Sequence, residues 1–209
     1  KYLHISRLKD VEAINKIRED EIDIMIDLNG FSSNHRLPLI KNRLAPIQVS
    51  WCGYTNTTGL NEMDYLIVDK NLIKPEEENF YSEKIIYLSN IWNCHCGYPF
   101  ERLENDMPSE KNKFITFGCF NNFRKINEDV IEAWSLILKR TKNSKLFLKT
   151  SIATSKKLFE KKFEKYGVLE SIIFSDYSKN FQDHLNEYKK VDIALDTFPW
   201  NGVTTSFEA

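Results

Sequence analysis

The segment Val191-Asp-Ile-Ala-Leu-Asp-Thr-Phe-Pro-Trp-Asn-Gly-Val-Thr-Thr-Ser-Phe-Glu-Ala209 is the most informative part of this chain. Its apolar start, Val191–Leu195, predicts a short buried strand, and the turn residues after it predict a loop. Thr204 and Thr205 then stand where a helix would begin. A helix that starts just beyond the carboxyl end of a strand offers backbone N–H groups and a partial positive charge, which favour phosphate. The two hydroxyls add donors, and Gly202 lets the backbone approach a ligand.

Strand-like and helical segments alternate along the rest of the chain. In the first half we expect strands over residues 22–28, 47–51, 64–68 and 84–88, and helices over residues 10–21 and 37–44. In the second half we expect strands over residues 114–120, 145–148 and 172–174, and helices over residues 128–140, 155–166 and 181–190, the first of them capped by Asn127. Such alternation predicts parallel α/β sheets.

The pattern lapses between residues 93 and 113, where Cys, Gly, Pro and scattered charges replace it. We therefore predict two α/β halves, residues 1–92 and 112–209, joined by a linker over residues 93–111. Neither half shows a visibly complete sheet, so we expect exposed strand edges and apolar faces. Such a chain is expected to associate or aggregate when isolated.

Composition excludes several classes of function. The chain has 209 residues, of which 42% are hydrophobic and 28% charged, as in ordinary soluble domains. Its net charge of −1 provides no basic field, so we expect neither nucleic acid nor a membrane as partner. The four cysteines lack the spacing of a disulfide framework, which favours a reducing cytoplasm. The seven glycines form neither G-x-G-x-x-G nor a P-loop, which disfavours dehydrogenases and P-loop kinases.

Two further segments carry candidate chemistry. The loop over residues 120–126 follows a predicted strand, where ligands bind in open α/β sheets. There Lys125 is suited to neutralise a diphosphate and Asn122 to bond a base or phosphate, although a solvated basic loop is an equal alternative. His184 lies beside Asp183 on a predicted helix and is either a surface residue or a ligand contact. Cys94-His95-Cys96 lacks the paired spacing of structural zinc sites, so we expect free thiols there.

A set of short motifs, in order and covering nearly the whole chain, resembles the O-linked N-acetylglucosamine transferase and SPINDLY-like family. The motifs are Asp27-Leu-Asn-Gly-Phe31 with Arg36, Ala45-Pro-Ile-Gln-Val-Ser-Trp-Cys-Gly-Tyr54, Thr57-Thr-Gly59, Met63-Asp-Tyr65, Tyr81-Ser-Glu83, Phe120-Asn121 with Lys125, Asp196-Thr197, and Asn201-Gly202 with Thr204-Thr205. Each motif alone is weak, but the ordered set is specific.

The resemblance implies a GT-B-like α/β fold with two Rossmann-like lobes, both incomplete in this chain, and a nucleotide-sugar between them. Members transfer a sugar from a nucleotide diphosphate donor, such as UDP-N-acetylglucosamine, to Ser or Thr hydroxyls of acceptor proteins. They invert the anomeric carbon and use no metal or other cofactor. The resemblance also implies tetratricopeptide repeats upstream and a catalytic region of which this chain is the middle part, inactive by itself.

The same resemblance assigns roles to matched positions. Lys125 would neutralise the leaving diphosphate, and we expect it to lie close to residues 202–205. The nucleotide-sugar would be held by Asn122, His184, Gly202, Thr204, Thr205 and Glu208, with Glu208 at the ribose and His184 on the base. Gly53 and Tyr54 would lie by the sugar, and Arg36 on the acceptor side.

The chain departs from the family pattern at three places. Thr55-Asn56 replaces a Pro-Gly pair, Asn122 replaces a glutamine, and Val203 replaces a histidine. The first departure leaves open a non-catalytic nucleotide-sugar-binding or scaffold module of the same fold. An unrelated phosphate-binding α/β protein is the third reading.

Overall fold

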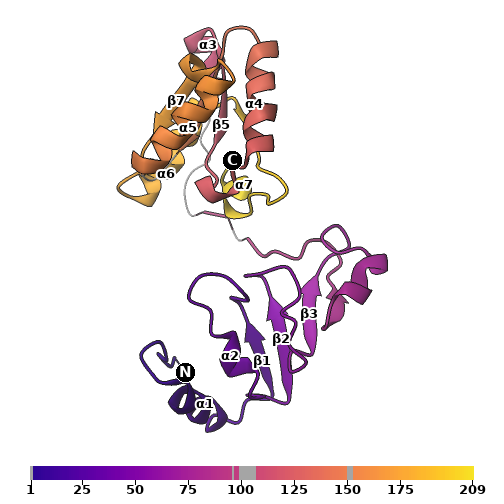
Figure 1. The fold of residues 1–209 in the computed structure, drawn as a ribbon. Coiled ribbons are helices and arrows are strands. Elements are labelled where there is room, and N and C mark those ends of the chain that lie inside the picture. Colours follow the sequence, from indigo (N-terminus) through magenta and orange to yellow (C-terminus); the bar gives the residue numbers. More distant parts are fainter. Residues whose placement is uncertain (1, 96, 99–106, 150–152) are drawn as a thin grey trace. The chain divides into compact units, whose positions relative to one another are not determined.

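The computed structural model describes residues 2–95, 97–98, 107–149 and 153–209, and divides the chain into two compact units, Lys1–Cys96 and Gly97–Ala209 (Figure 1). Residues 96 and 99–106 of the predicted linker lie outside the described residues, and so does the last cysteine of the Cys94-His95-Cys96 motif. The predicted α/β fold class is confirmed, because each unit is built on a parallel sheet.

The first unit contains a four-stranded parallel sheet whose strands follow one another in chain order. Its strands are β1 Ile24–Asp27, β2 Ile47–Trp51, β3 Tyr65–Val68 and β4 Lys84–Tyr87. All four were predicted to within two residues at either end. A 3₁₀ helix, η1 Pro75–Phe80, precedes β4.

Two helices, α1 Asp10–Arg18 and α2 Leu37–Ile40, pack on one face of this sheet, where Ala13, Leu39 and their neighbours surround Met25. Helix α2 ends four residues before the predicted position. The Asn42 side chain donates to the Pro38 and Leu39 carbonyls, and Arg43 adopts a left-handed conformation, which together stop the helix.

The opposite face of the same sheet is apolar and accessible among the described residues. Ile24, Ile26, Ile47 and Ile86 are between 39% and 56% exposed. The expected exposure of an apolar sheet face is therefore found, and association of the isolated chain stays a prediction.

The second unit contains a parallel sheet with the strand order β7-β6-β5-β8. Its strands are β5 Ile115–Cys119, β6 Ser144–Lys149, β7 Ile172–Ser175 and β8 Ile193–Ala194. The chain moves outward from β5 through β6 to β7 and then returns to the other side of β5. The strand order reverses between β5 and β8, so this is the topological switch point. In open α/β sheets ligands bind there, beyond the carboxyl ends of the strands.

Two long helices cover one face of this sheet. Helix α4 Glu128–Arg140 and helix α5 Ala153–Lys165 share one core with β5 and β6, in which Trp134, Phe163 and Leu146 are buried. Asn127 caps α4 as predicted, because its side chain accepts from the Val130 N–H. The remaining elements are α3 Pro108–Asn112, η2 Phe123–Lys125, η3 Leu169–Ser171, α6 Phe181–Glu187, η4 Tyr188–Lys190 and α7 Thr204–Glu208.

The prediction of a buried strand over Val191–Leu195 is wrong in both length and burial. Strand β8 has only two residues, Ile193 and Ala194, and Ile193 is 46% exposed. The strand lies at the edge of the sheet and pairs with β5 alone among the described strands, so an apolar run did not distinguish an edge from a core position. No described helix has the length and apolar character needed to cross a membrane.

Substitution of Gly53 tests the packing in the first unit. A Cβ at this position would lie 1.8 Å from the Leu28 carbonyl oxygen, so the backbone of one segment has to move. We expect Gly53→Ala to reduce the free energy of unfolding by on the order of 3 kcal/mol in urea denaturation. Gly59→Ala is the control, because its Cβ meets nothing within 4 Å and only its φ of +68° is strained, at a cost of about 1 kcal/mol. Equal losses for the two variants would contradict this packing.

Candidate functional site

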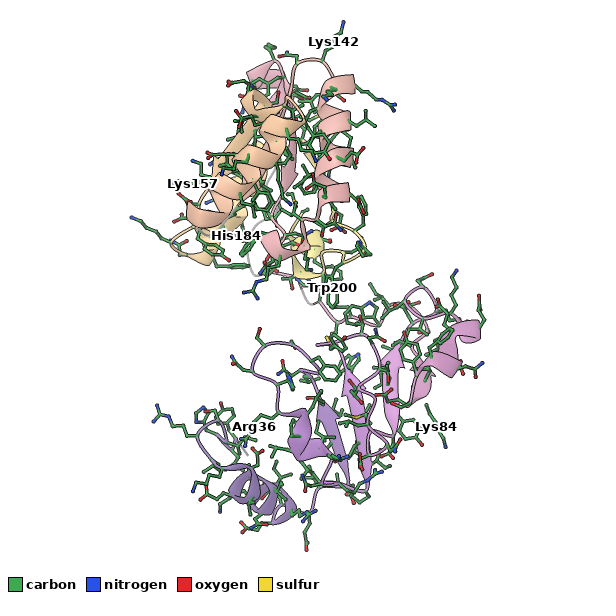
Figure 2. The ribbon with its side chains drawn as sticks, in the orientation of Figure 1. Arg36, Lys84, Lys142, Lys157, His184 and Trp200 are labelled. Carbon is green, nitrogen blue, oxygen red and sulfur yellow. The ribbon has the colours of Figure 1, made fainter. Side chains whose placement is uncertain are left out.

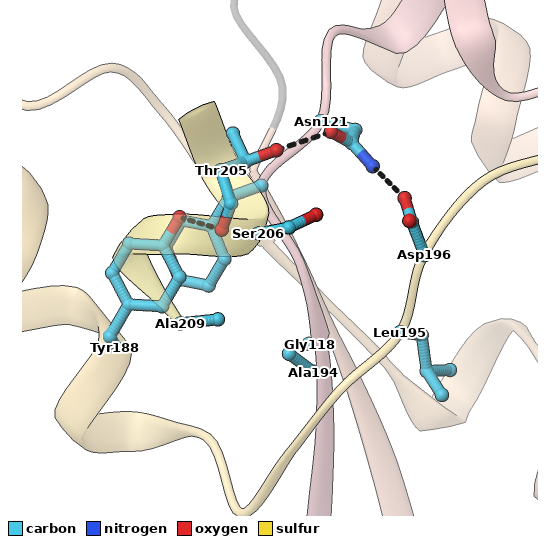
Figure 3. Close-up of a pocket in the computed structure, with 10 residues that line it drawn as sticks. Gly118, Asn121, Tyr188, Ala194, Leu195, Asp196, Thr205, Ser206 and Ala209 are labelled. Atoms are coloured by element: carbon cyan, nitrogen blue, oxygen red, sulfur yellow. Dashed lines mark hydrogen bonds between the residues drawn. The ribbon is translucent and has the colours of Figure 1, made fainter. Parts of the chain in front are cut away.

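Two loops meet at the switch point of the second unit, one after β5 and one after β8. Asn121, which is 5% exposed, connects them (Figure 3). Its Nδ2 donates to Asp196 Oδ1 at 2.8 Å, and its Oδ1 accepts from Thr205 Oγ1 at 2.5 Å. One amide side chain thus joins both loops to the start of α7.

The Asp196 carboxylate shapes the second of these loops. Oδ1 accepts the N–H groups of Thr197 and Gly202 at 2.8 and 2.7 Å, so the chain folds back on itself between residues 196 and 202. Burial acts to raise the pKa of Asp196, but hydrogen bonds from Gly202, Thr197 and the Asn121 amide outweigh it and hold the pKa below its usual value. The turn therefore depends on the ionised carboxylate.

Lys125 at the end of η2 reaches the same loop. Its Nζ donates to the Asn201 carbonyl at 2.7 Å, and Asn127 donates to the Phe198 carbonyl at 2.8 Å. Burial lowers the pKa of Lys125, and the nearby Asp196 carboxylate opposes that shift. The structure therefore places a partly desolvated ammonium next to residue 202, where the sequence led us to expect it.

The start of α7 is crowded with small polar groups. A Cβ on Gly202 would lie 2.6 Å from Thr205 Oγ1 and 2.7 Å from Ser206 Oγ, so only glycine allows this packing. The Gly202 N–H itself is bonded to Asp196. Thr204 and Thr205 occupy the first turn, where backbone N–H groups have no intrahelical acceptor.

A polar and aromatic cluster lies beside this helix start. His184, Glu187 and Tyr188 are three or four residues apart and share one face of the α6–η4 segment. Glu208 accepts from His184 Nε2 at 2.9 Å and from the Tyr188 hydroxyl at 2.8 Å, and Tyr98 contributes a longer bond of 3.3 Å. Burial, assisted by Glu208, raises the pKa of Tyr188, which therefore stays a donor.

Tyr188 also extends the site to the sheet. Its ring stacks on Phe120 at 3.8 Å, and its hydroxyl approaches the Thr205 carbonyl at 3.4 Å. A cavity of about 240 Å³ opens between these groups and the ends of β5 and β8, as Figure 3 shows. The cavity is lined by Gly118, Phe120, Asn121, Tyr188, Ala194, Leu195, Asp196, Thr205, Ser206 and Ala209.

The predicted residues of the second unit are mostly brought together. Lys125, Gly202, Thr205, His184 and Glu208 belong to one connected set of contacts, and Thr204 precedes Thr205 in the first turn of α7. Asn122 instead caps η2, since its side chain accepts from the Arg124 N–H at 3.0 Å.

The three predicted residues of the first unit have local partners. Gly53 lies against the backbone of Leu28, and the Tyr54 ring meets Phe31 edge-on at 5.4 Å. The guanidinium of Arg36 donates to the carbonyls of Ile5 and Leu8 at 2.7 and 3.2 Å and to the Asp10 carboxylate at 2.5 Å. Arg36 thus ties residues 5–10 to the segment before α2 (Figure 2).

Four members of the site had no role assigned from the sequence: Lys149 and Tyr188, and Asn121 and Asp196, which appeared only within family motifs. Lys149 carried a signal, because it is a charge at the end of a buried apolar strand. The others depend on contacts between distant segments, for which periodicity offers no signal. Among the described residues, no cluster of three or more His, Cys, Asp or Glu side chains is arranged to hold a metal ion.

Comparisons with known proteins agree on one family. A family model for glycosyl transferase family 41 matches residues 1–97 and 101–209. A probable UDP-N-acetylglucosamine–peptide N-acetylglucosaminyltransferase SPINDLY from Eustoma exaltatum subsp. russellianum is 35% identical over 97% of this chain. The corresponding SEC protein from Arabidopsis thaliana is 31% identical over 98% of the chain. The chain spans 22% of the length of each of these curated relatives.

A solved structure is also similar. A mutant O-GlcNAc transferase from Thermobaculum terrenum superposes with a TM-score of 0.85 at 33% sequence identity, covering 97% of this chain and 39% of that one. The likeness extends through both units.

Acid titration tests the role of Asp196. Its pKa is lowered in the folded state, so its contribution to stability is present above its unfolded pKa and is lost as the pH falls through the folded value. We expect Asp196→Asn to be less stable than wild type at pH 7 and the difference to shrink as the pH falls below about 4. Urea midpoints at pH 7 and pH 3 measure this. Both proteins contain the other carboxylates, so their contributions cancel in this comparison. A stability difference that stays constant with pH would contradict the role of Asp196.

Proposed function

Because this chain belongs to glycosyl transferase family 41, we propose that it forms part of an enzyme that transfers N-acetylglucosamine from UDP to Ser or Thr hydroxyls of acceptor proteins. The names of the SPINDLY and SEC relatives support the donor and the peptide acceptor. The single structural observation that carries the proposal is the reach of Lys125 Nζ to Asn201, beside the start of α7 at the strand switch point.

The chemistry requires stabilisation of a leaving diphosphate. As the bond between the sugar C1 and the β-phosphate oxygen breaks, negative charge develops on that oxygen. Lys125 exchanges the Asn201 carbonyl for this oxygen, and the N–H groups of Thr204 and Thr205 bond the phosphates. These groups are held in place before the reaction, so little reorganisation is required. We propose that protein groups, rather than a metal ion, balance the charge.

His184 and Glu208 are assigned to binding of the nucleoside. Both His184 nitrogens already have protein partners, so the ring offers its face to a base. An ionised carboxylate has about four acceptor positions, and Glu208 uses three of them within the protein. The fourth is assigned to a ribose hydroxyl.

The remaining assignments follow the family pattern. We propose that the acceptor oxygen attacks opposite the leaving diphosphate, which inverts the anomeric carbon. Gly53 and Tyr54 stay assigned to the sugar. The acceptor-side role of Arg36 stays a prediction, and it requires release of bonds that now hold residues 5–10. Tetratricopeptide repeats upstream and a cytoplasmic location are part of the same proposal.

A second candidate is a nucleotide-sugar-binding module without catalysis. The Thr55-Asn56 pair in place of Pro-Gly favours it, because that loop lies next to the proposed sugar position. Both candidates bind UDP, so a transferase assay on the full-length protein separates them.

Calorimetric titration with UDP tests the diphosphate site. We expect Lys125→Met to bind UDP roughly 10- to 100-fold more weakly than wild type, since a hydrogen bond to a charged group is removed. Lys142→Met is the matched control, because Lys142 is an exposed lysine in the loop after α4 (Figure 2). Uridine provides the second control, because it has no phosphate for Lys125 to hold. Equal UDP affinities for wild type and Lys125→Met would refute the site.

A further inference from the structure

Lys149 is a buried cation that the proposed mechanism does not use. It ends strand β6, and its side chain is 4% exposed. The ammonium donates to Ser178 Oγ at 2.6 Å and to Glu187 Oε2 at 2.5 Å, and it lies 3.0 Å from His184 Nδ1. Because a buried charge requires partners, these contacts fix the ammonium in one place.

The contact with Lys149 determines the proton arrangement of His184. An ammonium can only donate, so Nδ1 accepts through its lone pair. The ring proton then resides on Nε2, which donates to Glu208 Oε2 at 2.9 Å. The imidazole is therefore held at both nitrogens, in one tautomer and in one orientation.

Aromatic rings fix the same imidazole from its sides. Phe181 lies nearly parallel to it at 6.0 Å, and Phe120 and Tyr188 meet it edge-on at 5.8 and 5.6 Å. The His184 side chain keeps 21% of its surface exposed. A ligand can therefore contact the ring face but has no free ring nitrogen to bond.

We propose that Lys149 is a positioning residue that holds His184 in the Nε2–H form and restricts it to stacking on the base of the donor nucleotide. This inference rests on the proposed function for its ligand, while the hold on the ring is a property of the unliganded protein.

Removal of the ammonium changes the charges around the ring. The groups that face this cluster are Lys149 from β6, Glu187, Tyr188 and Lys190 from α6–η4, Glu208 from α7, and Tyr98. Without Lys149 the carboxylates of Glu187 and Glu208 remain, and the buried cation is replaced only by the exposed Lys190, 3.5 Å from Glu187 Oε1. Nδ1 then takes up a proton, and the ring becomes a cation that is no longer held on that side.

The test is the ¹⁵N spectrum of the His184 imidazole at pH 7, assigned by comparison with His184→Gln. In wild type we expect an unprotonated Nδ1 and a protonated Nε2. Lys149→Met keeps the length of the side chain but has no donor, and in this variant we expect a protonated Nδ1. Lys149→Arg restores a donor and is expected to restore the wild-type spectrum.

UDP binding provides the functional readout. We expect Lys149→Met to weaken UDP binding about tenfold, with partial recovery in Lys149→Arg. Lys157→Met, on the exposed side of α5, is the matched control and leaves both readouts unchanged (Figure 2). If Lys149→Met does not fold, the double variant Lys149→Met/Glu187→Gln also removes the carboxylate that loses its buried lysine partner. In this variant we expect Nε2–H no longer to be the single form of the ring.

The outcomes separate this inference from the proposed function. A His184 spectrum that is the same in wild type and in the lysine-free variants would overturn the inference. Equal UDP affinities despite a changed spectrum would overturn the positioning role. UDP that fails to bind wild type at all would refute the proposed nucleotide site, and the spectrum would still decide whether Lys149 holds the ring.

Discussion

The hydrogen bond between Asn121 and Asp196 is the interaction on which the candidate site depends. Strand β8 pairs with β5 through only two residues, so the sheet by itself cannot hold the loop that follows it. Three side chains from the loop after β5 hold it instead: Asn121 bonds Asp196, Lys125 bonds Asn201 and Asn127 bonds Phe198. The 2.8 Å bond of Asn121 places the carboxylate around which the turn to residue 202 is built.

This arrangement explains how a weak edge strand can support the proposed anion site. Asp196 neutralises part of the field of Lys125, while its Oδ1 accepts backbone and amide donors and the Lys125 ammonium donates to the Asn201 carbonyl. The ammonium rests on a neutral carbonyl, which a phosphate oxygen can replace with a gain in electrostatic energy. The same loop then leads directly into α7, whose first-turn N–H groups add to the positive potential.

Much of the fold was predictable because it depends on local pattern. The strands over residues 47–51 and 84–88 and the Asn127 cap follow from apolar runs and from one side chain bonding its own helix. The prediction failed at Val191–Leu195, since an apolar run is equally compatible with an edge strand.

The site was predictable only in part, for a different reason. Lys125, Thr205 and His184 stood out by their places after a predicted strand, at a predicted helix start and on a predicted helix, and the family resemblance then assigned their roles. Asn121 and Asp196 are 75 residues apart, and Lys149 and His184 are 35 apart. Contacts of this kind arise when strands β5, β6 and β8 align their carboxyl ends, so they become visible only after the strand order is known.

A crystal structure of this chain with UDP is the most direct measurement of the central claim. The account predicts the β-phosphate within hydrogen-bonding distance of Lys125 Nζ and of the Thr204 and Thr205 N–H groups, with the bond from Lys125 to Asn201 broken. Phosphates bound away from the β5–β8 switch point, with Lys125 still on the Asn201 carbonyl, would contradict it.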